Sequence, residues 1–163
     1  MRSTPSVAGL PPQYRKPTPK ELVVVRRTLE LGVPLKTLDG VIGPTDPDEK
    51  ERLIARLMTH LEKSEVTYDC TCGCLSFSVR GWPDNADSHC IAQAYGRAPS
   101  TGPMAVVVFG NDAQIGGVDV APLAPDQYDL DLPLVDSMVA DSEELGQGWE
   151  PPPPGWAPRR GQR

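Results

Sequence analysis

Two stretches in the first half of the chain have the apolar spacing of amphipathic helices. Thr18-Pro19-Lys20-Glu21 is a capping box with proline at the first helical position, so a helix is expected to begin there. Gly32 followed by Pro34 is expected to end it. A second helix is expected from Asp46-Pro47, with an apolar stripe predicted to pack on a sheet: Leu53, Ile54, Leu57, Met58 and Leu61.

After the second helix, the pattern changes to the two-residue alternation that is typical of strands. The alternation predicts two short strands, at 66–68 and 75–79. Longer strands are expected over 89–95, 104–109 and 114–120. A turn is predicted at 110–112, and Gly116-Gly117 indicates a bulge or a close backbone approach. A short helical piece is expected around 134–138.

These elements predict an α+β fold, in which two N-terminal helices pack on a four- to five-stranded antiparallel meander. Residues 18–145 would form its single domain. Five of the 19 prolines fall in the stretch that ends at Pro19, which predicts a flexible basic N-terminal segment over 1–17. Pro151 to Pro154 favour polyproline II, so residues 146–163 are expected to be a disordered Pro-rich tail.

Charge along the chain is unevenly distributed, with a net charge of −6. Residues 126–144 contain no Lys or Arg. An acidic surface of this kind repels nucleic acid and membranes and attracts a basic partner. No signal peptide and no apolar run of membrane-spanning length is visible, which predicts a cytoplasmic protein with reduced thiols.

Cys70-Thr71-Cys72-Gly73-Cys74 is the densest chemical feature of the sequence. If Tyr68 pairs with Phe77, residues 71–74 form a hairpin loop with Cys72 and Cys74, and Cys70 lies at the end of the strand beneath it. The three sulfurs are ligands suited to zinc. The fourth ligand would be Cys90, with His89 as its alternative. In a simple meander, however, Cys90 lies about 16 Å from the loop, five residues of strand away.

Two other interpretations of Cys70, Cys72 and Cys74 stay open. They are a tight structural turn without metal, or reactive thiols in a redox protein. No Lys, Arg or His lies within five residues of the run to lower a thiol pKa. No nucleophile elbow, phosphate-binding loop or dinucleotide fingerprint is present either, so the sequence assigns no catalytic residues and argues against an enzyme.

The order of these features resembles a group of small uncharacterised bacterial proteins. Their T-P-x-E helix start, C-x-C-G-C turn and later hairpin correspond to Thr18–Glu21, Cys70–Ser76 and the stretch 105–120. The resemblance implies the same architecture and no particular activity.

The sequence therefore predicts a non-enzymatic interaction protein that binds a macromolecular protein partner through its acidic C-terminal half, which favours a basic partner. Proteins that neutralise a toxin, such as immunity proteins and antitoxins, are an analogy for this behaviour. The alternatives are a zinc-binding module on the cysteine turn and a thiol-dependent redox protein. Trp149 and Trp156 flank the proline run, either as a docking peptide or within a tail without structure.

Overall fold

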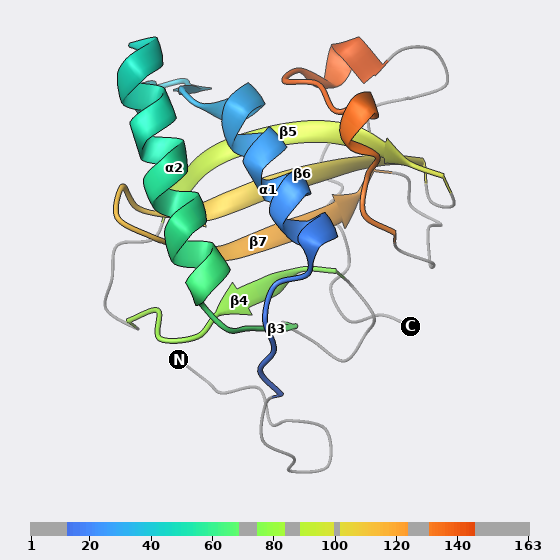
Figure 1. The fold of residues 1–163 in the computed structure, drawn as a ribbon. Helices are drawn as coiled ribbons and strands as arrows, with labels where there is room; N and C mark the ends of the chain where they lie inside the picture. Colours follow the sequence, from blue (N-terminus) through green and yellow to red (C-terminus); the bar gives the residue numbers. More distant parts are fainter. Residues whose placement is uncertain (1–12, 69–74, 84–88, 100–101, 124–130, 146–163) are drawn as a thin grey trace.

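Two helices lie side by side over one face of a five-stranded antiparallel sheet (Figure 1). The α+β class predicted from the sequence is thus confirmed. The computed structural model describes residues 13–68, 75–83, 89–99, 102–123 and 131–145. In chain order the elements are α1 (Pro19–Gly32), β1 (Leu35–Thr37), β2 (Gly40–Ile42), α2 (Pro47–Lys63), β3 (Val66–Tyr68), β4 (Phe77–Val79), β5 (His89–Ala98), β6 (Gly102–Gly110), β7 (Ile115–Pro122) and the 3₁₀ helices η2 (Val135–Ser137) and η3 (Ser142–Leu145).

Both helices begin where their capping residues predict. The Thr18 hydroxyl accepts the Glu21 N–H at 3.1 Å, and the Glu21 carboxylate accepts the Thr18 N–H at 2.8 Å. In α2 the Asp46 carboxylate accepts the Glu49 N–H at 3.0 Å. These bonds satisfy backbone donors that the first helical turn leaves unpaired. All five residues of the predicted apolar stripe of α2 are buried.

Helix α1 ends at Gly32, as expected from Gly32 and Pro34. Gly32 is itself helical, and Val33, the residue after it, turns extended at φ −104°. A Cβ atom on Gly32 would lie 2.6 Å from the Gln93 nitrogen and 2.7 Å from its carbonyl oxygen. Glycine is therefore required because α1 lies directly on the backbone of β5. Helix α1 crosses the central strands, and α2 packs beside it (Figure 1).

The sheet is not a simple meander. Its strand order is β3-β4-β7-β6-β5, so β4 pairs with β7 where a meander would place it beside β5. Tyr68 does pair with Phe77 as predicted. Strands β5, β6 and β7 pair consecutively, and the short β3–β4 hairpin joins the free side of β7. A Cβ on Gly117 would lie 3.2 Å from the Phe77 carbonyl oxygen, so the small residue allows this approach.

Two irregularities shape the β6–β7 hairpin. The register shifts between Phe109 and Gly110, just before the predicted turn, where the Asn111 side chain accepts two backbone N–H groups. The close backbone approach expected at Gly116-Gly117 is present at Gly117, which faces the Phe77 carbonyl oxygen. At Gly116 the neighbour is the Trp82 ring, and an added Cβ would lie 2.7 Å from it.

Arg15 ties the start of the described chain to the domain. Its guanidinium makes two hydrogen bonds to the Glu21 carboxylate, at 2.7 and 2.9 Å, and stacks over the Tyr68 ring at 4.4 Å. Its backbone exchanges two hydrogen bonds with Val66. The packed structure thus includes Arg15, which lies within the segment 1–17 expected to be flexible.

Backbone segments pair with both edge strands of the sheet. Arg15 bonds to Val66 on the β3 edge, and Val139 exchanges two backbone hydrogen bonds with Tyr95 on the β5 edge. Pairing of this kind occupies edge groups that would otherwise accept a foreign strand. No helix in the described part of the chain is both long enough and apolar enough to cross a membrane.

Candidate functional site

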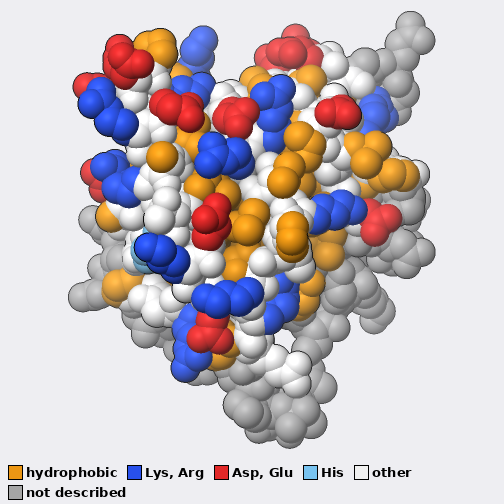
Figure 2. Space-filling view, in the orientation of Figure 1, with side chains coloured by type: hydrophobic (Ala, Val, Ile, Leu, Met, Phe, Trp, Pro, Cys, Tyr) orange, Lys and Arg blue, Asp and Glu red, His pale blue; other side chains and the backbone are white. Residues whose placement is uncertain are grey.

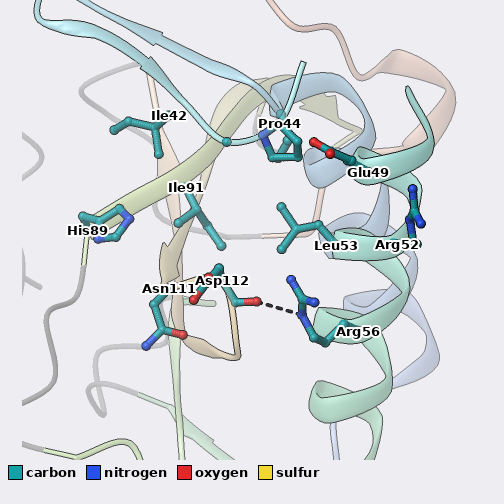
Figure 3. Close-up of a pocket in the computed structure, with 12 residues that line it drawn as sticks. Ile42, Pro44, Glu49, Arg52, Leu53, Arg56, His89, Ile91, Asn111 and Asp112 are labelled. Carbon is teal, nitrogen blue, oxygen red and sulfur yellow. Dashed lines mark hydrogen bonds between the residues drawn. The ribbon is translucent and has the colours of Figure 1, made fainter. Parts of the chain in front are cut away.

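A pocket of about 430 Å³ lies between the first turns of α2, the end of the β1–β2 hairpin, the start of β5 and the β6–β7 turn (Figure 3). Its apolar lining comes from four different segments: Val33, Ile42, Leu53 and Ile91. Charged and polar side chains surround this lining: Glu49, Arg52, Arg56, His89, Asn111 and Asp112.

The local sequence explains why these side chains meet. Glu49, Arg52, Leu53 and Arg56 are spaced at three or four residues, so they share one side of α2 at the border of its buried stripe. On β5 the register shifts between Cys90 and Ala92. The extra residue, Ile91, is 7% exposed and lines the pocket. The β bulge therefore interrupts the alternation of β5, so that Ile91 and Ala92 are both buried and Ile91 lines the pocket.

Arg52 and Arg56 each use one guanidinium nitrogen to hold a backbone carbonyl. Arg56 Nε donates to the Asp112 oxygen at 2.9 Å (Figure 3), and Arg52 Nε donates to the Asp48 oxygen at 3.2 Å. Within the described ranges, no carboxylate lies within 4.0 Å of either guanidinium. By contrast, Arg15, Arg27 and Arg80 each pair with a glutamate. The pocket therefore presents two exposed cations that neutral carbonyl groups hold.

None of the described residues that line the pocket carries a hydroxyl or thiol group. Nucleophilic catalysis needs such a group, or a lysine or carboxylate, next to a base within hydrogen-bond reach. No hydrogen bond joins His89 to either pocket carboxylate among the described residues. The arrangement is therefore suited to holding a ligand, with apolar contacts in the middle and charged groups around the rim.

The candidate metal ligands fall in different places. His89 is exposed at the pocket, and Cys90 is half-buried beside it on β5. Cys70, Cys72 and Cys74 lie outside the described residues. The strand before them, β3, and the strand of Cys90, β5, are opposite edges of the sheet. Four strand spacings separate them, about 19 Å.

No group of three or more metal-ligating side chains occurs in the part of the chain that the structure describes. The zinc hypothesis for the cysteine run stays a prediction. Elemental analysis of untagged protein, purified under reducing conditions, tests it.

Cys90 is expected to be a slow nucleophile. Burial raises the pKa of its thiol above the usual value of 9.0, and the backbone hydrogen bond with Ala92 does not offset this effect. Because only the thiolate attacks, we expect iodoacetamide to alkylate Cys90 several-fold more slowly at pH 7 than in the urea-unfolded chain. Peptide mapping by mass spectrometry measures this rate. Equal rates in the folded and unfolded chains would show that Cys90 is not protected.

The pocket was not predicted from the sequence. The sequence does show charged residues, Glu49, Arg52 and Arg56, along the border of the apolar stripe. This spacing indicates a pocket only once the opposite wall is known. That wall includes the β1–β2 hairpin, which the sequence indicates only as a loop.

Comparisons with known proteins add no relative to this description. No protein-family model matches the chain, and neither the curated proteins nor the solved structures contain a match. The function of the protein is therefore inferred from the geometry of the site.

Proposed function

We propose that this chain is a non-enzymatic interaction protein that binds a protein partner through the β1–β2 hairpin and the pocket beside it. One observation carries the proposal. Leu38 and Val41 project from the hairpin at 106% and 55% relative exposure, directly next to an apolar-lined pocket. Single exposed apolar residues are common, but a fully exposed leucine at a hairpin tip has no role in the described fold.

The hairpin and the pocket form a continuous surface along the chain. Ile42, Gly43 and Pro44 follow Val41 and line the pocket. A partner that covers Leu38 and Val41 thus reaches the pocket mouth without crossing another element. Apolar groups at the centre with charged groups at the rim is the usual composition of a protein interface.

A second candidate surface is the acidic segment 131–145, which would bind a basic partner. Four of its carboxylates are exposed and form no salt bridge with any described residue: Asp136, Asp141, Glu143 and Glu144. Around α1 and α2, by contrast, cationic and anionic side chains are interspersed with apolar ones (Figure 2). Long-range attraction of a basic partner would therefore come from the C-terminal segment rather than from the two helices.

A comparison of partner recovery by two variants tests the proposal. We expect Leu38→Ser with Val41→Ser to reduce recovery of the partner at least about tenfold, because loss of two apolar anchors costs more than 1.4 kcal/mol. Affinity purification of the full chain from its own cells, with quantitative mass spectrometry, measures recovery. Val23→Ser, an exposed apolar position on α1, is the matched control and should recover the partner normally.

The second variant carries Asn or Gln at Asp136, Asp141, Glu143 and Glu144. If this variant loses the partner and the hairpin variant keeps it, the acidic segment is the binding surface. If both variants keep the partner, neither surface is its binding site.

A further inference from the structure

We infer that the pocket is a recognition site for a carboxylate that adjoins an apolar group. This inference deepens the proposed function, on which it rests, because it names the chemistry of the partner segment that enters the pocket. The carboxylate would contact Arg56 at the lower rim, and the apolar group would cover Leu53 and Ile91 (Figure 3).

The first argument is the state of Arg56. The Asp112 carbonyl holds its Nε, so the guanidinium is fixed at the pocket by a neutral acceptor. Its two Nη atoms make no hydrogen bond with any described residue. A planar guanidinium with free parallel donors matches the two oxygens of a carboxylate, and an arginine held in place loses little entropy on binding.

The second argument is the arrangement of charge around the pocket. His89 and Arg56 face each other across Ile91, and Glu49 lies at the opposite end, beside Pro44 (Figure 3). Glu49 and Arg56 are seven residues apart on α2, which is about 10 Å along its axis. Glu49 repels an anionic group at its end of the pocket, although Arg52 lies there too, and Arg56 attracts an anionic group at the other end. The Asp112 carboxylate also lines the pocket, and a bound carboxylate must lie away from it.

The third argument is size and polarity. A volume of about 430 Å³ exceeds that of one leucine side chain and falls within the usual range for ligand pockets. An apolar group that covers Leu53 and Ile91 excludes water from the Arg56 site. Exclusion of water strengthens the charge-assisted hydrogen bonds there. The apolar and anionic parts of one ligand thus reinforce each other.

The experiment uses N-acetyl-leucine and N-acetyl-leucinamide, which differ only in the carboxylate, in a titration followed by backbone amide NMR. We expect N-acetyl-leucine to bind with a millimolar dissociation constant and to shift the signals of Leu53, Ile91 and Asp112. The amide should bind at least about tenfold more weakly, as should N-acetyl-leucine to Arg56→Gln. Arg80→Gln, an exposed arginine outside the pocket, is the matched control and should bind as the wild type does.

A third ligand identifies the source of the carboxylate. N-acetyl-glutamyl-leucinamide carries the acid on a side chain, with no free terminus. If it binds better than N-acetyl-leucine, the carboxylate is that of an acidic side chain. If it binds worse, the pocket takes a chain terminus. Both outcomes support recognition of a carboxylate.

The inference is overturned if the amide binds as well as the acid, if neither produces shifts at the pocket, or if Arg56→Gln binds normally. Thermal unfolding shows whether Arg56→Gln keeps the fold. The Arg56 side chain is exposed, so the substitution should cost little stability. The proposed function fails by a different result, namely that partner recovery is unchanged by the hairpin substitutions Leu38→Ser and Val41→Ser.

Discussion

Arg15→Ala is expected to destabilise the protein by about 3 kcal/mol, because it leaves the Glu21 carboxylate buried without its cation. Glu21 is 4% exposed and accepts two hydrogen bonds from the Arg15 guanidinium. The variant also loses the contact with the Tyr68 ring. Urea denaturation measures the loss, and thermal unfolding should show a melting temperature roughly 6–12 °C lower.

The effect of Arg15→Ala should depend on pH. Burial raises the pKa of Glu21, but hydrogen bonds and attraction from Arg15 and the Thr18 N–H outweigh burial and hold the pKa below 4.5. A carboxyl group with a lowered pKa stabilises the fold above its unfolded pKa, and this contribution is lost as pH falls through the folded pKa. The gap in stability between wild type and variant should therefore narrow below about pH 4.5.

Arg80→Ala is the matched control, because Arg80 also pairs with a glutamate and stacks on a tyrosine. Both members of its pair are exposed, so the loss should stay below about 1 kcal/mol. Equal losses for the two variants would show that burial of Glu21 adds nothing to the Arg15 pair.

Gly32→Ala is expected to destabilise the protein by about 2–3 kcal/mol, the opposite sign from the usual effect. Inside a helix, alanine normally gains about 0.5–1 kcal/mol over glycine. Here the added methyl group meets the backbone of Gln93 at 2.6 Å. Backbone atoms of a strand paired in the sheet do not move aside as a flexible side chain would. Helix α1 must therefore shift away from β5 and loosen the core between them.

Urea denaturation of Gly32→Ala gives this free energy of unfolding directly. Val23→Ala is the control on the same helix, and its exposed position predicts a change within about 0.5 kcal/mol. A more stable Gly32→Ala protein would mean that the last turn of α1 does not rest on β5.

Local sequence patterns predicted the elements whose signals are strong and short in range. Capping residues located both helix starts, and the five-residue stripe located the buried side of α2. Alternation located the strands of the five-stranded sheet. The pairing of Tyr68 with Phe77 followed from keeping apolar residues on one side of that sheet. These inferences depend on neighbouring residues alone, which is why they hold.

The remaining features depend on contacts between distant segments. The pairing of β4 with β7 joins residues about 40 positions apart, as in Phe77 with Val118, and no local pattern specifies it. The β1–β2 hairpin has three-residue strands with exposed side chains, so it lacks the alternation that predicts a strand. The pocket needs this hairpin, together with Arg56, the start of β5 and the β6–β7 turn, and it was therefore beyond prediction.

The backbone pairing at the two sheet edges has a consequence for synthesis on the ribosome. The chain emerges from its N-terminal end, so Arg15 is available when β3 appears, whereas Val139 emerges more than forty residues after its partner Tyr95. Until then the outer edge of β5 lacks the bonds that close it in the complete fold. Nascent chains paused between these two points would thus be the form most prone to strand exchange with one another.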